Sequence, residues 1–92
     1  MTTSHESPLF VKQLRQAGHV IRFSIFSKET GGWEVKEESG TQVLKQVRLS
    51  DWHRVERARE VFSLKALSLQ EAGWVEDSLS PLSLRRTFGA AQ

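Results

Sequence analysis

Apolar residues recur at three- and four-residue steps over residues 50–73, which predicts one long amphipathic helix. The apolar stripe consists of Val55, Ala58, Phe62, Ala66 and Leu69. Ser50 suits the N-cap position, because its hydroxyl can accept a hydrogen bond from an amide of the first turn. Gly73 suits the left-handed position just past the helix end. Such a helix would be about 33 Å long, so the other elements are expected to pack against it.

Upstream of this helix, apolar and polar residues alternate with the period of two that is typical of half-buried strands. The alternation is clearest over residues 19–27 and continues over residues 33–38 and 41–49. Gly31-Gly32 and Ser39-Gly40 predict the two connecting turns. Lys45 interrupts the inward face of the third strand, which predicts a bulge or a shifted register. Leu44 would then be exposed or would exchange roles with its neighbour.

Residues 7–18 are predicted to form a short helix. Ser7-Pro8 is typical of an N-cap followed by proline at the first helical position, and Gly18 can end the helix. Phe10, Leu14 and Ala17 fall on one helical face. A strand through residues 9–11 is the alternative. The predicted fold class is therefore α+β, with a short N-terminal helix, a three-stranded antiparallel meander and a long C-terminal helix packed on the sheet.

Length and composition favour one small domain in a chain of 92 residues. We expect a disordered leader at residues 1–6, a single α+β domain at 7–75, and an extended or partly docked tail at 76–92. Trp33 and Phe62 are expected to be buried together between sheet and helix. The chain contains no cysteine, and it has no apolar run long enough for a membrane span. A cytoplasmic location without membrane association is the expectation.

Charge and motif content point away from catalysis. Thirteen Lys and Arg against eleven Asp and Glu leave a formal charge of only +2, which is not the strong field of a dedicated nucleic-acid binder. His5, His19 and His53 lack metal-ligand spacing. The sequence contains no evident nucleophile–base pair and no glycine-rich phosphate loop. We therefore expect no catalytic, cofactor or metal site, no small-molecule substrate and no enzyme.

The run from Gly31 to Glu60 resembles small bacterial proteins of unassigned function, through Trp33-Glu34-Val35 and the segment 51–58. This resemblance implies no activity. The expected element order is similar to that of the double-stranded RNA-binding domain, but Asp51 stands where that family opens its second helix with a lysine-rich phosphate clamp. A strand set followed by a long helix is also similar in topology to the positive cofactor 4 type of single-stranded DNA binders, whose helices mediate dimerisation.

Two hypotheses for function follow from the long helix. Val61 and Leu64 lie outside the main stripe and widen the apolar surface beyond what one small sheet covers, which is typical of an interaction site. The alternative is that the predicted N-terminal helix or the segment 74–84 folds back and covers both residues. The first hypothesis is a non-enzymatic module that makes protein–protein contacts, as a homodimer or with another protein, through Val61, Leu64, Arg57 and Glu60. The alternative is a nucleic-acid-binding module. Its candidate contacts lie at the basic junction between strand and helix, where an aromatic ring accompanies guanidinium groups: Arg48, Trp52, Arg54 and Arg57.

Overall fold

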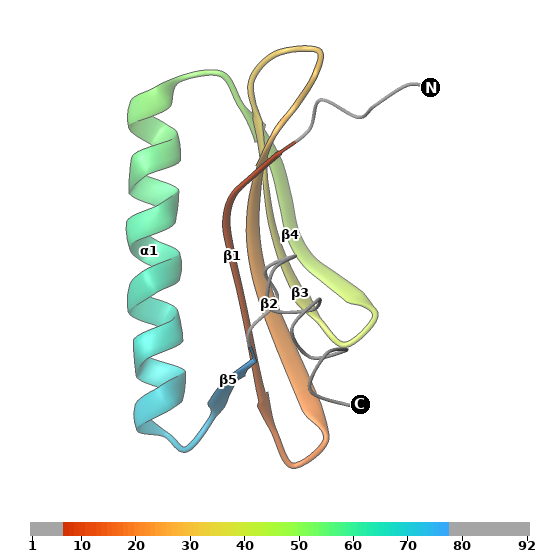
Figure 1. Cartoon of the computed structure of the whole chain (residues 1–92), viewed down its shortest axis with the longest axis vertical. Helices are drawn as coiled ribbons and strands as arrows, with labels where there is room; N and C mark the ends of the chain where they lie inside the picture. Colours follow the sequence, from red (N-terminus) through yellow and green to blue (C-terminus); the bar gives the residue numbers. More distant parts are fainter. Residues whose placement is uncertain (1–6, 78–92) are drawn as a thin grey trace, which may run out of the picture.

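The computed structural model describes residues 7–77, so the predicted leader and residues 78–92 of the predicted tail lie outside the described residues. The elements are β1 (Ser7–Gln16), β2 (His19–Ser27), β3 (Trp33–Ser39), β4 (Gln42–Leu49), α1 (Trp52–Glu71) and β5 (Val75–Asp77). The strands form one sheet in the order β4-β3-β2-β1-β5, with every neighbouring pair antiparallel. The helix lies along one face of this sheet (Figure 1).

The predicted fold class is wrong at the N-terminus, where strand β1 replaces the expected short helix. Phe10 and Leu14 are four residues apart, a spacing that fits one face of a helix but also fits a strand, whose side chains repeat every second residue. In β1 these two residues lie opposite Ile25 and Ile21 of β2. Ala17 and Gly18, expected at the helix end, form the two-residue turn, and both have the positive φ that a tight hairpin requires.

The predicted three-stranded meander is also wrong, because β1 to β4 form a four-stranded meander and β5 adds a fifth strand. β5 pairs with β1 on the edge away from β2, where Leu14 lies opposite Glu76. Arg15 Nη2 lies 2.6 Å from Asp77 Oδ2 and so ties the two strands together. Glu76 and Asp77, which were predicted to lie in the tail, therefore belong to the sheet.

The irregularity predicted at Lys45 is present in β4. Lys45 lies opposite Glu37 and Val43 lies opposite Glu38, so Leu44 is an extra residue without a partner in β3. Such a bulge shifts which face each following residue occupies. Leu44 is exposed, and Lys45 keeps the phase of Val47 and Leu49 on the helix side of the sheet.

The long helix is continuous over 20 residues, as the apolar stripe predicts. Its N-cap is Asp51 rather than Ser50: Asp51 Oδ1 accepts a hydrogen bond of 3.0 Å from the backbone N–H of His53. At the other end the amide of Gly73 donates to the carbonyl of Gln70, and the amide of Trp74 donates to that of Leu69. Gly73 has φ 106°, so the left-handed position predicted for this glycine is confirmed.

The core lies between α1 and the centre of the sheet. The fully buried apolar residues are Leu14, Phe23, Ile25, Val35, Val55, Phe62 and Ala66. Phe62 contacts the rings of Phe23 and Phe10 at centroid distances of 4.8 and 6.2 Å. Trp33 is only partly buried, and its ring contact is with Trp52 at 5.3 Å. The expected burial of Trp33 directly with Phe62 is therefore replaced by two separate aromatic contacts.

One helix cannot cover this whole sheet. Five strands about 4.8 Å apart are roughly 19 Å wide, whereas a helix with its side chains is about 10 Å wide. The buried contacts of Phe62 are with β1 and β2. The outer strand β4 is correspondingly open, and every residue from 42 to 48 is exposed. The fold thus leaves free surface along both β4 and the adjoining side of α1.

Candidate interaction surface

Helix α1 presents exposed apolar side chains outside its buried stripe. Val61 is 41% exposed, Leu64 is 64% exposed and Leu67 is 50% exposed. With 3.6 residues per turn, Val61 and Leu64 are neighbours on the helix surface, and so are Leu64 and Leu67. Because Val55, Phe62 and Ala66 occupy the buried side, these three side chains have no place in the core. We call them the helix patch.

A second exposed apolar group lies on β4. Val43, Leu44 and Val47 are all exposed, and β4 is the outer strand of the sheet. A strand of eight residues whose outer edge has no partner strand among residues 7–77 offers unpaired backbone groups to another strand. The open side of the molecule therefore has two candidate contact elements, the helix patch and the β4 edge.

A groove of about 300 Å³ lies between α1 and β4. Its lining is Lys45, Leu49, Arg54, Arg57, Ala58, Val61 and Phe62. The floor is apolar, the rim carries three cationic side chains, and no acidic residue contributes to the lining. None of these three cations forms an ion pair within residues 7–77. A groove of this kind favours anionic or apolar groups over cations.

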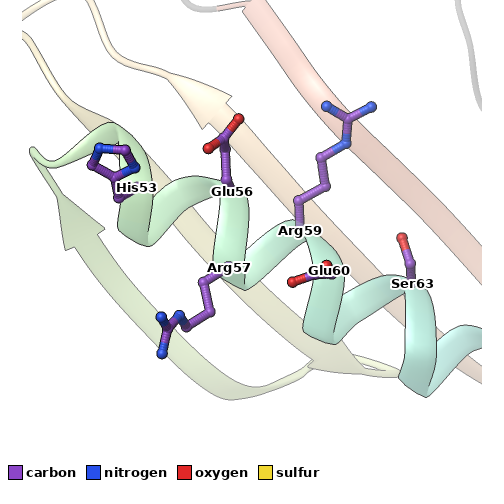
Figure 2. Close-up of a pocket in the computed structure, with 6 residues that line it drawn as sticks. All are labelled: His53, Glu56, Arg57, Arg59, Glu60 and Ser63. Atoms are coloured by element: carbon purple, nitrogen blue, oxygen red, sulfur yellow. The ribbon is translucent and has the colours of Figure 1, made fainter.

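The candidate dimer residues lie close together on α1. Arg57 and Glu60 are exposed beside Val61 and Leu64. Along the outer side of α1 a depression of about 550 Å³ is lined by His53, Glu56, Arg57, Arg59, Glu60 and Ser63 (Figure 2). Glu56 and Arg59 project to one side of the helix and Arg57 projects to the other. Glu56 and Arg59 form no ion pair in the described part of the chain, and neither do Arg57 and Glu60.

The structure divides the candidate nucleic-acid contacts into two groups. Arg48 is held by the turn between β2 and β3, where its guanidinium donates to the carbonyl of Gly31 at 2.7 Å and to the hydroxyl of Thr30. Trp52 packs against Trp33 but keeps 41% of its surface exposed. Arg54 and Arg57 instead line the groove.

Lys45 also lines the groove, although it is not among the predicted nucleic-acid contacts. The feature of the sequence that could have indicated Lys45 is that this charged residue interrupts the apolar face of β4. A charged residue on an inward face is favoured only where that face opens to solvent. Lys45 therefore marks the open side of the sheet.

Electrostatic pairing elsewhere on the sheet supports the fold through two carboxylates, those of Glu34 and Asp77. The pKa of Glu34 is lowered, chiefly because Gln46 Nε2 donates a hydrogen bond of 2.6 Å to its carboxylate, with Lys28 nearby. The pKa of Asp77 is lowered chiefly by the hydrogen bond from Arg15 and then by that from Gln13. Both carboxylates are partly buried, and both are already engaged by neighbouring strands.

Residues 7–77 contain no group of three or more His, Cys, Asp or Glu side chains placed to hold a metal ion. No helix in that part of the chain is both long and apolar enough to cross a membrane. The chain matches no protein-family model, no curated protein and no solved structure. The resemblances to small bacterial proteins, to the double-stranded RNA-binding domain and to the positive cofactor 4 type therefore stay predictions.

Proposed function

We propose that this protein is a small non-enzymatic binding module that acts through protein–protein contacts and forms a homodimer. The observation that carries the proposal is the helix patch, Val61, Leu64 and Leu67, which is contiguous and exposed on the rigid helix. Contiguous exposed apolar surface marks interaction sites, and closed two-fold dimers are the commonest assemblies of soluble proteins. The absence of cysteine from the whole sequence supports a reducing compartment, so we place the module in the cytoplasm.

The test is the oligomeric state of the full chain by sedimentation velocity. We expect a dimer at micromolar concentration, and we expect Val61→Glu with Leu64→Glu to give a monomer with unchanged helix content by circular dichroism. Burying two carboxylates per copy against a partner is costly, whereas both positions tolerate charge in the monomer. Ser63→Glu is the matched control, because Ser63 is also exposed but lies outside the helix patch. A monomeric wild type at these concentrations would contradict the proposal.

A second candidate function is the binding of single-stranded nucleic acid in the groove. It is favoured by the three cations on the groove rim, by the absence of acidic lining residues, and by the partly exposed ring of Trp52 at the same end of α1. Such ligands combine phosphate contacts with stacking of bases on aromatic rings.

Fluorescence anisotropy with a labelled single-stranded oligonucleotide at low salt tests this candidate. We expect binding that weakens steeply as salt is added and that is lost in the variant Lys45→Glu with Arg54→Glu. The control is Arg59→Glu, which alters charge equally per residue on the other side of the helix. Absence of binding by the wild type at low salt would reject the candidate.

A further inference from the structure

We infer that the second copy docks as an antiparallel helix pair, with α1 of one protomer lying along α1 of the other and the two-fold axis passing beside Leu64. This inference rests on the proposed homodimer and specifies its interface. Leu64 has the largest exposed fraction of any apolar residue on the helix, at 64%. It also lies near the middle of the stretch Trp52–Glu71, so an axis there lets most of both helices overlap.

The sequence around Leu64 is self-complementary under this symmetry. A two-fold axis at Leu64 places residues equally far before and after it opposite one another. Val61 of one copy then lies opposite Leu67 of the other, and Leu64 lies opposite Leu64. All three members of the helix patch are therefore buried, and each apolar side chain meets another apolar side chain.

The charges that flank the patch agree with the same register. Arg57 lies seven residues before Leu64 and Glu71 lies seven residues after it, and a step of seven returns to the same side of a helix. Arg57 of each copy therefore faces Glu71 of the other, which gives two reciprocal ion pairs. Both side chains are exposed, and neither forms an ion pair within the described residues.

The pair that lies closer to Leu64 also fits the antiparallel register. Glu60 of one copy lies opposite Ser68 of the other, and the serine hydroxyl can donate a hydrogen bond to the carboxylate. No like charges face each other along this side of the helix. A parallel arrangement would instead bring Arg57 against Arg57 and Glu71 against Glu71. Charge complementarity therefore selects both a second copy as the occupant and the antiparallel direction.

The β4 edge offers a competing way to dimerise, in which two copies of β4 pair about Gln46. That arrangement would extend the sheet but would leave Val61, Leu64 and Leu67 uncovered on the helix. It would also leave Arg57 and Glu71 without the partners described above. The helix pair buries the helix patch and gives Arg57 and Glu71 ion-pair partners, whereas pairing of the β4 edges does neither. Pairing of the β4 edges is an alternative outcome that the experiment can detect.

Single-cysteine cross-linking tests the inference cleanly, because the chain has no cysteine of its own. Packed helix axes are about 8–10 Å apart and each Cα lies about 2.3 Å from its axis, so residues on the symmetry axis come within the reach of a disulfide. We expect Leu64→Cys to form a disulfide-linked dimer on mild oxidation. Ser63→Cys is the control, because Ser63 is also exposed but lies outside the helix patch. A dimer cross-linked at Gln46→Cys and not at Leu64→Cys would overturn the inference.

A charge exchange gives an independent readout from sedimentation equilibrium. Arg57→Glu alone, or Glu71→Arg alone, should weaken the dimer about tenfold, because each change introduces two like-charge contacts. The double variant Arg57→Glu with Glu71→Arg should restore the wild-type dissociation constant. Failure of rescue, in a protein whose wild type is dimeric, would overturn the antiparallel register while leaving the homodimer intact. A monomeric wild type would instead overturn the proposed function itself.

Discussion

Phe23 of β2 and Phe62 of α1 lie with their ring centroids 4.8 Å apart, and this contact joins the helix to the centre of the sheet. Both residues are essentially inaccessible to solvent. Aromatic pairs at this separation contribute beyond the burial of their surface. The position of the helix against the sheet depends on this contact.

Truncation of the Phe62 side chain should strongly destabilise the protein. We expect Phe62→Ala to lower the free energy of unfolding by about 3–5 kcal/mol, as for other buried aromatic residues. Urea denaturation followed by tryptophan fluorescence measures the change. The neighbouring variant Ser63→Ala should stay within about 0.5 kcal/mol of the wild type, because Ser63 is exposed. Equal stability of Phe62→Ala and the wild type would show that the helix phase is wrong.

The capping of α1 can be tested with two adjacent residues. Asp51→Ala removes the carboxylate that accepts from the His53 amide, and we expect a loss of about 1 kcal/mol. Ser50→Ala should have little effect, because the side chain of Ser50 is exposed and caps no amide within the described residues. Thermal or urea denaturation of both variants decides between them. A larger loss for Ser50→Ala would assign the cap to Ser50.

The turn between β2 and β3 provides another matched pair. Gly31 and Gly32 both have positive φ, so alanine is strained at either position. A Cβ at Gly32 would lie 2.8 Å from the backbone oxygen of Leu49, whereas a Cβ at Gly31 would meet nothing within 4 Å. Gly32→Ala should therefore cost about 1–3 kcal/mol more than Gly31→Ala, the usual penalty of overpacking. Similar unfolding free energies for the two variants would contradict the close approach of this turn to β4.

The ion pair between β1 and β5 should make stability depend on pH in the acid range. The pKa of Asp77 is lowered in the folded state, so its stabilising contribution is present above the unfolded pKa of about 3.9 and is lost as pH falls through the lower folded value. Asp77→Asn should therefore reduce the melting temperature at neutral pH. The difference from wild type should shrink as the pH falls below the unfolded pKa and vanish once both the folded and the unfolded states are protonated.

Glu56→Gln is the control for this measurement, because Glu56 is exposed and forms no ion pair in the described part of the chain. Its melting temperature should follow that of the wild type across the whole pH range. A difference between Asp77→Asn and wild type that grows as the pH falls would mean that the folded pKa of Asp77 is raised, contrary to the arrangement with Arg15.

The local pattern of apolar residues was sufficient to predict those elements whose periodicity fits only a helix or only a strand. The stripe through Val55, Phe62 and Ala66 repeats only at helical spacing, and α1 forms where it predicts. Alternation over residues 19–27 fits only a strand, and β2 has those bounds. The exposure of Val61 and Leu64 also followed from sequence, because their phase on the helix is incompatible with the buried stripe.

Tertiary structure decided the elements whose apolar pattern fits both the helical repeat and the two-residue repeat of a strand. Phe10 and Leu14 satisfy both a helix and a strand, and the choice of β1 depends on pairing with β2, which local propensity does not contain. The same holds for β5, whose three residues gain their backbone partners only from β1. Short segments of this kind are stabilised by partners distant in the chain, so their own residues do not specify them.

The candidate site divides in the same way. Its residues on α1 could be predicted, because helical geometry alone fixes which side chains share a side. The groove could not, since Lys45 reaches Arg54 and Arg57 only when β4 becomes the outer strand beside α1. That arrangement arises because a single helix, about 10 Å wide, cannot cover a sheet nearly twice its width and leaves residues 42–48 of β4 exposed.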